Sequence, residues 1–437
     1  MTSGLVIAAP ASGSGKTTLT LGVLRALRER GVRVAGAKVG PDYIDPGFLA
    51  AAAGRPAPNL DAWAMRQSTI GALLADLADA ELVVVEGVMG LFDGIGAAGV
   101  GSTADLAQLL GWPVVLVLDA RGTAASAAAM LRGFVAHRPS LTVAGVIANR
   151  VGGAGHAAVI DQACAIACPH VRRLGAVPRD ATLALPERHL GLVPAREHGA
   201  LEDFVARAGA RVAQHIDLAA LTALAAPALE PIPEDDAPGL PPLGQRIAIA
   251  DDAAFAFRYP HLIAGWRRAG ADIVPFSPLA DAAPDPDADA IYLPGGYPEL
   301  HAGRLAGNRR FLDALRAAAR RGGAIYGECG GYMVLGRALI DAAGAAHAMA
   351  DLLPLTTSFA ARKLHLGYRA ATLLADGALG AAGTRLRGHA FHYASVIDEG
   401  PGAALFEATD AHGQDAALAG RVSGTVAGSF IHIIDRA

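Results

Sequence analysis

Two series of short apolar segments, separated by a proline-rich stretch, limit how this chain of 437 residues can fold. The segments are rich in β-branched residues and almost free of polar ones, as buried parallel strands are, and helical patterns lie between them. We expect strands at residues 4–9, 33–39, 81–86, 113–119, 142–148 and 172–177, and then at 246–250, 272–275, 289–293 and 323–327. The pattern predicts an α/β protein with two parallel sheets.

The stretch between the two series predicts a linker between two domains. Residues 226–244 contain six prolines and the acidic run Glu234-Asp235-Asp236, a composition typical of an exposed connection. We therefore expect one domain over residues 1–225 and a second over 245–437. In the second, helical patterns fit residues 258–269 and 305–320.

Composition and charge exclude several classes of protein. With 52% hydrophobic residues the chain is globular, and its apolar runs are too short to span a membrane. A net charge of −4 without a basic stripe argues against nucleic acid or an anionic membrane as the main partner. Three cysteines make no disulfide framework, and the N-terminus has no secretory pattern, so we expect a cytoplasmic location.

A glycine-rich segment after the first predicted strand indicates a phosphate-binding loop at the start of a helix. Leu19, Val23 and Leu27 mark the buried face of that helix. Glycines let successive backbone N–H groups wrap phosphate oxygens, while a lysine and a hydroxyl meet the outer phosphates and a magnesium ion. Pro10 replaces the usual first glycine of this pattern, so a turn without function stays open. The predicted ATP-binding residues are Ser12, Gly13, Ser14, Gly15, Lys16, Thr17, Thr18 and, at the end of a later strand, the base-reading candidate Asn149.

Carboxylates follow two other predicted strands of the first series. Asp42 and Asp45 lie in Gly40-Pro41-Asp42-Tyr43-Ile44-Asp45-Pro46, and Glu86 ends the strand at 81–86. Acidic residues at the carboxyl ends of parallel strands face the ligand crevice of an α/β sheet. With Thr17 they form our predicted Mg²⁺ site, and Asp93 lies on the loop after Glu86.

A cysteine in the second half lies where a nucleophile is expected. Gly327-Glu328-Cys329-Gly330-Gly331 follows an apolar strand and precedes a helical segment, so Cys329 occupies a sharp strand-to-helix turn. The following helix offers N–H groups and a positive dipole end that favour a thiolate. His432, near the C-terminus, is the candidate base.

These motifs together carry a resemblance that covers nearly the whole chain. The first half resembles the dethiobiotin-synthetase-like P-loop amide synthases. The second resembles the class I glutamine amidotransferase domain, with a flavodoxin-like fold, of the cobyrinic acid a,c-diamide synthase and cobyric acid synthase group. The resemblance rests on the segments already quoted and on Val85–Gly94, Asn149–Gly152, Leu185–Leu192, Leu293–Glu299 and Gly327–Met333.

The resemblance implies a glutaminase in the second half. Cys329 would attack the side-chain amide of glutamine, and His432 would carry its proton to the departing ammonia. Backbone N–H groups at Gly296 and Gly330 would stabilise the oxyanion. Many relatives place an acid two residues after the histidine, whereas this chain has Ile434 there and Asp435 one position later. We therefore expect a Cys-His pair with a weakly oriented imidazole.

The resemblance also implies a carbon–nitrogen ligase of cobalamin biosynthesis in the first half. ATP and Mg²⁺ would convert the a and c acetate carboxylates of cobyrinic or hydrogenobyrinic acid to acyl phosphates, which ammonia would turn into amides. Its implied partners are small molecules, namely glutamine and a corrinoid polycarboxylate, and a homodimer stays open. The candidate substrate residues are Lys38, Tyr43, Asp93, Arg188 and His189.

Three alternatives remain at this stage. Cobyric acid synthase and nickel-sirohydrochlorin a,c-diamide synthase share the chemistry and differ in substrate. A P-loop ATPase that uses an inactive glutaminase-like module as a scaffold is the third, and intact Cys329 and His432 argue against it. The residues do not indicate whether the ring carries cobalt.

Overall fold

The computed structural model describes residues 2–184, 186–188, 191–229 and 239–437. The chain divides into two compact units, Met1–Glu234 and Asp235–Ala437, each with its own sheets. Residues 230–238 of the predicted linker, including its acidic run, lie outside the described residues, as does the substrate candidate His189.

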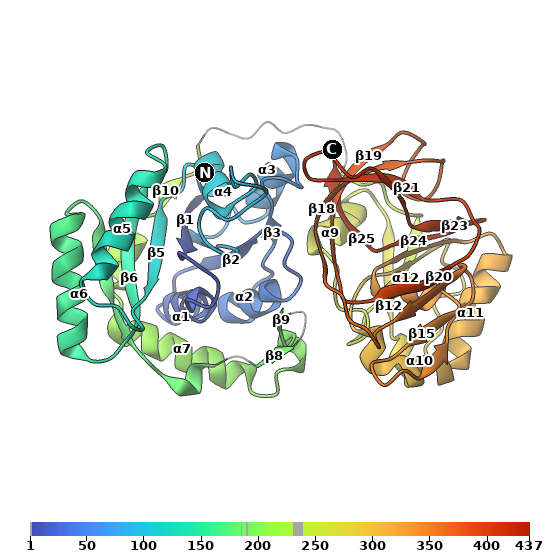
Figure 1. Cartoon of the computed structure of the whole chain (residues 1–437), viewed down its shortest axis with the longest axis horizontal. Coiled ribbons are helices and arrows are strands. Elements are labelled where there is room, and N and C mark those ends of the chain that lie inside the picture. Colours follow the sequence, from blue (N-terminus) through green and yellow to red (C-terminus); the bar gives the residue numbers. More distant parts are fainter. Residues whose placement is uncertain (1, 185, 189–190, 230–238) are drawn as a thin grey trace. The chain divides into compact units, whose positions relative to one another are not determined.

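A parallel sheet forms the centre of the first unit (Figure 1). Its strands follow the order β3-β2-β4-β1-β5-β6-β7, and the short β10 (Ala226–Pro227) pairs antiparallel with β1. The bounds are β1 Ser3–Ala8, β2 Val34–Val39, β3 Asn59–Leu60, β4 Leu82–Glu86, β5 Val114–Asp119, β6 Val143–Val151 and β7 Arg172–Pro178. The predicted α/β fold with a parallel sheet is confirmed, because β1 pairs parallel with β4 and β5. These three strands are buried over almost their whole length.

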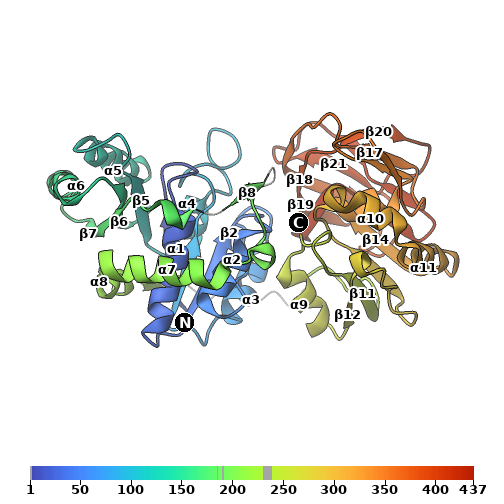
Figure 2. The ribbon, with the colours of Figure 1, turned by 90° about the horizontal axis from the view of Figure 1, so that it is seen from below.

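Helices connect these strands. They are α1 Lys16–Glu29, α2 Asp45–Ala53, α3 Gln67–Ala75, α4 Thr103–Leu110, α5 Ser126–His137, α6 Ala154–Ala167, α7 Leu201–His215 and α8 Leu218–Thr222, with a two-stranded ribbon of β8 Glu187–Arg188 and β9 Gly191–Leu192. Helix α7 packs across α1 (Figure 2). At Gly22 a Cβ atom would stand 2.6 Å from the Ala208 carbonyl oxygen, so only glycine allows this close approach. Leu19, Val23 and Leu27 are buried, as the helical pattern predicted.

A second, six-stranded sheet begins the other unit. Its order is β12-β11-β13-β14-β24-β23, parallel except for the pair β23 and β24. The bounds are β11 Arg246–Ala250, β12 Asp272–Phe276, β13 Ala290–Leu293, β14 Ala324–Glu328, β23 Arg421–Ser423 and β24 Val426–Ser429, with helices α9 Pro260–Arg268, α10 Ala302–Gly307, α11 Arg309–Arg320 and α12 Gly330–Leu335. The single helix expected over 305–320 is two helices. Asn308 breaks it with ψ 76°, and its side-chain amide donates to the Pro278 carbonyl oxygen at 2.7 Å.

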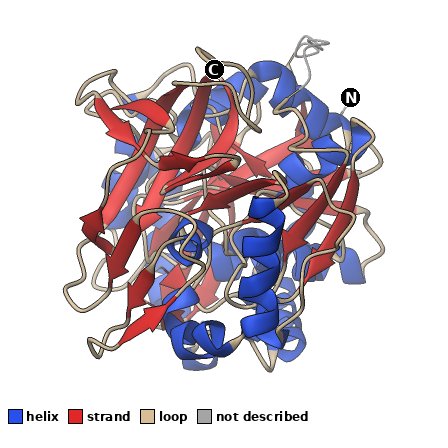
Figure 3. Cartoon of the chain, turned by 90° about the vertical axis from the view of Figure 1, so that its right-hand side faces the viewer, coloured by secondary structure: helices blue, strands red, loops and turns tan. Residues whose placement is uncertain are grey.

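Two further sheets, which the sequence patterns did not predict, complete this strand-rich unit (Figure 3). One has the order β16-β15-β17-β20 and the other β22-β21-β18-β19-β25. Their bounds are β15 Ala338–Ile340, β16 Ala346–Ala348, β17 Leu355–Ser358, β18 His365–Leu373, β19 Arg385–His392, β20 Ser395–Glu399, β21 Phe406–Asp410, β22 Ala417–Ala419 and β25 Ile431–Arg436. The chain thus passes from the six-stranded sheet to the five-stranded one between Ser429 and Ile431.

In the part of the chain that the structure describes, every helix is too short or too polar to cross a lipid bilayer.

Candidate active sites

The phosphate-binding candidate lies between β1 and α1. Gly13 and Gly15 have φ of 76° and 84°, the left-handed region in which side chains other than glycine are strained. The Ser14 hydroxyl donates to the Ala11 carbonyl oxygen at 2.8 Å. The loop therefore has the backbone shape that a phosphate cradle needs, although Pro10 stands where the usual pattern has glycine.

Asn149, predicted to read a nucleotide base, contacts the loop itself. Its side-chain amide donates to the Ser14 carbonyl oxygen at 2.9 Å, and a Cβ atom on Gly15 would stand 2.4 Å from that nitrogen. The next residue, Arg150, donates to the Gly13 carbonyl oxygen at 2.5 Å and pairs with Asp119 at 2.7 Å. Two neighbouring residues of β6 thus hold two carbonyl groups of the loop. Arg150 lies in a segment that carries the resemblance, but the sequence did not assign it a role.

Beside the loop, three charged side chains form a buried cluster. Lys38 Nζ lies 2.6 Å from Asp45 Oδ2 and 3.0 Å from Glu86 Oε1, and Lys38 is 2% exposed. Burial alone would lower the pKa of Lys38, but Asp45, Glu86 and Asp42 raise it, so the ammonium stays charged. Burial also raises the pKa of Glu86 to about 7, against the opposing effect of Lys38.

Part of this cluster suits a magnesium ion. The Thr17 hydroxyl donates to Glu86 Oε1 at 2.5 Å, whereas the buried Glu86 Oε2 has no hydrogen-bond partner. Within the described residues no three His, Cys, Asp or Glu side chains group closely enough to hold a metal by themselves. Mg²⁺ commonly binds one or two carboxylates and completes its shell with phosphate oxygens and water. Thr17 and Glu86, with Asp45 nearby, fit that donor set.

Asp42, the fourth predicted metal ligand, is engaged with the backbone. Its Oδ1 accepts hydrogen bonds from the N–H groups of Ile44 and Asp45, both at 2.8 Å, just before α2. Burial raises its pKa, and the neighbouring Asp45 adds to that effect. This oxygen shapes the turn into α2, a role that the spacing of the motif did not indicate.

The predicted substrate residues lie in different surroundings. The ammonium of Lys38 is buried and paired with Asp45 and Glu86, and its role toward the substrate stays a prediction. Tyr43 is half-buried before α2, while Asp93 is exposed and accepts from the Gly90 N–H at 2.8 Å. A pocket lined by Asp93 also contains Pro10, Phe92, Met130, Phe134 and His137. Arg188 pairs with Glu197 at 2.7 Å.

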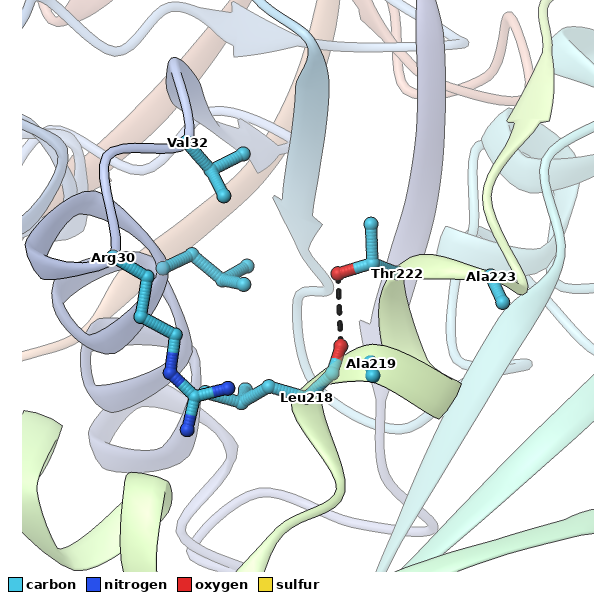
Figure 4. Close-up of a pocket in the computed structure, with 7 residues that line it drawn as sticks. Arg30, Val32, Leu218, Ala219, Thr222 and Ala223 are labelled. Atoms are coloured by element: carbon cyan, nitrogen blue, oxygen red, sulfur yellow. Dashed lines mark hydrogen bonds between the residues drawn. The ribbon is translucent and has the colours of Figure 1, made fainter.

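Another pocket of the first unit lies away from these residues (Figure 4). It is lined mainly by apolar side chains of α1, of α8 and of the residues just after each helix, with Arg30 at one side. Its one hydroxyl, that of Thr222, donates to the Leu218 carbonyl oxygen at 2.8 Å. This pocket offers no group for phosphoryl or acyl transfer.

In the second unit, Cys329 occupies the predicted sharp turn between β14 and α12. It has φ 48° and ψ −102°, a strained backbone for a residue with a side chain. Its N–H donates to the Ser429 carbonyl oxygen at 2.8 Å. A Cβ on Gly331 would stand 1.9 Å from the Leu293 carbonyl oxygen, which explains a glycine after the turn.

The thiol of Cys329 meets both predicted oxyanion donors. Burial and the nearby Glu299 raise the pKa of Cys329, while hydrogen bonds from the N–H groups of Gly330 and Gly296 oppose that rise. The net effect raises the pKa of Cys329, so the turn does not favour the thiolate as the sequence analysis expected. Helix α12 has only six residues, and burial outweighs its positive end. The thiol needs a base before it can attack.

His432 lies on β25 and is 1% exposed. A Cβ on Gly295 would stand 2.3 Å from His432 Cε1, 3.1 Å from its Nε2 and 3.3 Å from Cys329 Cβ. Cysteine and imidazole thus flank the same glycine. Burial lowers the pKa of His432 to about 3, with His389 and His392 adding to the effect, so the imidazole is neutral and able to accept a proton.

Two families of known proteins match this chain. Residues 5–193 match the CobQ/CobB/MinD/ParA nucleotide binding domain, and residues 246–436 match the CobB/CobQ-like glutamine amidotransferase domain. Each match contains one of the two sites described above.

Full-length relatives are similar to both halves together. Hydrogenobyrinate a,c-diamide synthase of Rhodobacter capsulatus is 54% identical over 434 residues, which is 99% of this chain and 98% of the relative. The proteins of the same name from Brucella anthropi and Rhizobium meliloti are 53% and 52% identical, each over 99% of this chain and 98% and 99% of their own lengths.

Proposed function

The chain belongs to the hydrogenobyrinate a,c-diamide synthase family, and from this premise we propose that it amidates the a and c acetate side chains of hydrogenobyrinic acid. It is an ATP-dependent glutamine amidotransferase. The observation that carries the choice of the metal-free ring is identity above 50% along nearly the whole chain to relatives of that name. None of the three relatives reported above carries the name of a cobyric acid synthase or of a scaffold ATPase.

The glutaminase step uses the residues around Cys329. His432 takes the thiol proton, and the sulfur attacks the side-chain carbonyl carbon of glutamine. The oxyanion of the resulting tetrahedral intermediate lies at the N–H groups of Gly296 and Gly330, which already converge on the sulfur. His432 then gives its proton to the departing ammonia, and water releases glutamate from the thioester.

The ligase step uses the first unit. The loop from Ser12 to Thr18 holds ATP, and Lys16 neutralises charge on the transferred phosphoryl group. Thr17, Glu86 and Asp45 would hold Mg²⁺, which would supply Lewis-acid neutralisation of the phosphates. A substrate carboxylate oxygen attacks the γ-phosphorus and displaces ADP. Ammonia then attacks the acyl carbon of the acyl phosphate, so phosphate leaves and an amide forms.

The candidate residues for binding the ring carboxylates are chosen by their positions in the first unit. Tyr43 and Asp93 follow the strands that carry the Lys38 cluster, and Arg188 supplies a guanidinium group on β8. His189 stays a candidate from the sequence alone. We place the substrate between these groups and the phosphate-binding loop. A cytoplasmic location completes the proposal, since Cys164, Cys168 and Cys329 are all free thiols.

One experiment tests the function. Purified protein is incubated with ATP, Mg²⁺, glutamine and either hydrogenobyrinic or cobyrinic acid, and the product mass is followed. We expect two amidations of the metal-free ring. ATP hydrolysis without any change in either ring would contradict the proposal and favour a cobyric acid synthase or a scaffold ATPase.

A further inference from the structure

Glu328, the residue before the nucleophile, is a buried carboxyl group that the glutaminase step above does not use. It ends β14 and is 2% exposed. A carboxyl group is rarely buried in this way unless partners compensate for the loss of water. Its partners therefore indicate what it does.

Three donors fix this carboxyl group in place. The Tyr292 hydroxyl donates to Oε2 at 2.7 Å, the Tyr326 hydroxyl to Oε1 at 3.0 Å, and the Ile433 backbone N–H to Oε1 at 3.0 Å. The two tyrosine rings stack on each other with an interplanar angle of 8°. Such a set of donors stabilises a carboxylate and leaves it little freedom to rotate.

The same carboxyl group faces the imidazole of the candidate base. Glu328 Oε2 lies 3.9 Å from His432 Nδ1, and the Ile433 N–H that binds Oε1 belongs to the next residue on β25. Glu328 thereby ties the strand of the base to the strand of the nucleophile. Other titratable groups near His432 are Cys329, which follows Glu328 on the turn after β14, and His389 and His392 on β19.

The nearby Asp435 does not take this place. It stands three residues after His432, beyond a register shift in the pairing of β25 with β19. Its charge acts on His261, whose ring also meets the Ile434 carbonyl oxygen at 2.8 Å. The acid that many relatives carry after the histidine is thus absent from β25.

Proton transfer from the thiol creates an imidazolium in a buried site, which is costly without a compensating negative charge. In cysteine and serine hydrolases a carboxylate at the second ring nitrogen supplies that charge and orients the ring. Burial raises the pKa of Glu328 to about 7, so a substantial fraction is ionised near neutral pH.

We propose that Glu328 is the positioning residue of the glutaminase and completes a Cys329–His432–Glu328 triad from the nucleophile strand. It orients Nδ1 of the imidazole and stabilises the imidazolium that forms when the thiol proton moves to Nε2. The inference rests on the proposed function, because it needs a glutaminase that depends on Cys329.

The first test compares glutamine hydrolysis in the wild type, Glu328→Gln and the control Tyr292→Phe. Glutamine at 328 keeps the size of the side chain and loses its charge, so we expect kcat to fall about 100-fold with little change in KM. Tyr292→Phe removes one donor and keeps the carboxyl group, so its loss should stay below about fivefold. Equal losses in both variants, or a kcat within about twofold of wild type in Glu328→Gln, would overturn the proposal.

The second test reads the pH dependence of Cys329 alkylation by iodoacetamide, followed by mass spectrometry of the peptide that carries it. A carboxylate that acts only as a nearby charge disfavours the thiolate, so its removal would shift the reaction to lower pH. Removing a carboxylate that stabilises the imidazolium has the opposite effect on the alkylation profile. We therefore expect Glu328→Gln to shift the reaction to higher pH. That shift should disappear in a His432→Ala background, since coupled residues are non-additive. A downward shift, or the same upward shift without His432, would contradict the triad.

A further variant covers the case in which Glu328→Gln does not fold. Tyr292→Phe with Tyr326→Phe keeps the carboxyl group and removes both hydroxyl donors, which should raise the Glu328 pKa and move the alkylation profile to higher pH. An unchanged profile would count against the proposal.

A comparison of wild-type protein with Cys329→Ala distinguishes failure of the proposed function from failure of the Glu328 inference. Without Cys329-dependent glutamine hydrolysis in the wild type the proposed function fails, whereas hydrolysis that Glu328→Gln leaves intact removes only this inference.

Discussion

The backbone N–H of Cys329 donates to the carbonyl oxygen of Ser429 at 2.8 Å, so the nucleophile turn is bonded to the point where the chain leaves one sheet for the next. Three residues later the chain presents His432. A long stretch of sequence separates nucleophile and base, and this pairing of β14 with β24 brings them to the same glycine. The geometry of the glutaminase thus depends on one sheet register.

Cys329→Ala should abolish the use of glutamine and leave ligation with free ammonia. The thiol is the attacking atom of the glutaminase, whereas the phosphate-binding loop and the Lys38 cluster lie in the first unit. Product formation with each nitrogen donor measures this. Equal loss with both donors would contradict a two-site enzyme.

Gly295→Ala should lower glutamine hydrolysis by about 100-fold. Its Cβ would stand 2.3 Å from His432 Cε1, so the ring must move away from the thiol. Gly265→Ala is the matched control, because it lies in α9 with no atom within 4 Å of a new Cβ and should keep full activity. The kcat of glutamine hydrolysis, measured for both variants at saturating glutamine, tests this prediction, and equal activity of the two variants would contradict it.

Lys38→Met should destabilise the first unit by about 3–5 kcal/mol, since it leaves Asp45 and Glu86 buried without their cation. Lys363→Met, at an exposed position, should change stability by less than about 0.5 kcal/mol. Urea unfolding of the two variants gives the comparison. A Lys38 variant as stable as wild type would show that the cluster is not ionised as described.

Asn149→Ala should weaken ATP binding without affecting glutamine hydrolysis. The variant removes the hydrogen bond to the Ser14 carbonyl oxygen, so the loop is less well ordered before phosphate binds. We expect the KM for ATP to rise about tenfold, equivalent to the loss of one net hydrogen bond of about 1.4 kcal/mol. A change in nucleotide preference without a change in KM would instead favour the base-reading prediction.

Acid should destabilise the second unit through its buried histidines. Burial lowers the pKa of His389, His392 and His432 to about 3, below the ordinary 6.5. Between these values the unfolded chain binds protons that the folded one does not, so stability is lost as pH falls from 6.5 towards 3. The raised pKa of Glu328 acts in the opposite direction, because between pH 4.5 and about 7 its folded form binds the extra proton.

His389→Gln tests this sign. Removing one such histidine should reduce the slope of unfolding free energy against pH by about 1.4 kcal/mol per pH unit between about pH 4 and 6. Urea titrations across this range measure the slope. An unchanged slope would mean that His389 is protonated in the folded protein.

Local signals in the sequence located most strands of both parallel sheets, with the centre of each prediction falling inside an observed strand, but missed β3, β23 and β24. The prediction worked because fully buried strands must be continuously apolar, as Leu82–Glu86 is up to its last residue. The sheets from β15 onward were missed, since strands such as His365–Leu373 are half exposed and mix polar with apolar residues. Asn308 was likewise not recognised as the break between α10 and α11.

Which of the candidate residues act stays a prediction, but the structure changes how several are understood. Lys38 and Asp42 carry motif signals for ligand binding and are engaged with Asp45 and with backbone N–H groups. Arg150 and Glu328 lie in quoted motifs but were assigned no role; Arg150 contacts the phosphate loop, and Glu328 faces the candidate base. Pairings between positions far apart in the chain leave no local pattern.

The sequence by itself determined the α/β class, the two chemical centres and the turn on which Cys329 lies, because glycines, apolar runs and a lysine at fixed spacing act through local backbone geometry. Only the tertiary structure decided the ionisation of these groups and their partners. Burial against residues from other strands raises the pKa values of Cys329 and Glu328, lowers that of His432, and brings Glu328 to face the imidazole that β25 presents. Desolvation and proximity are properties of the folded sheet order, which no single segment of the chain contains.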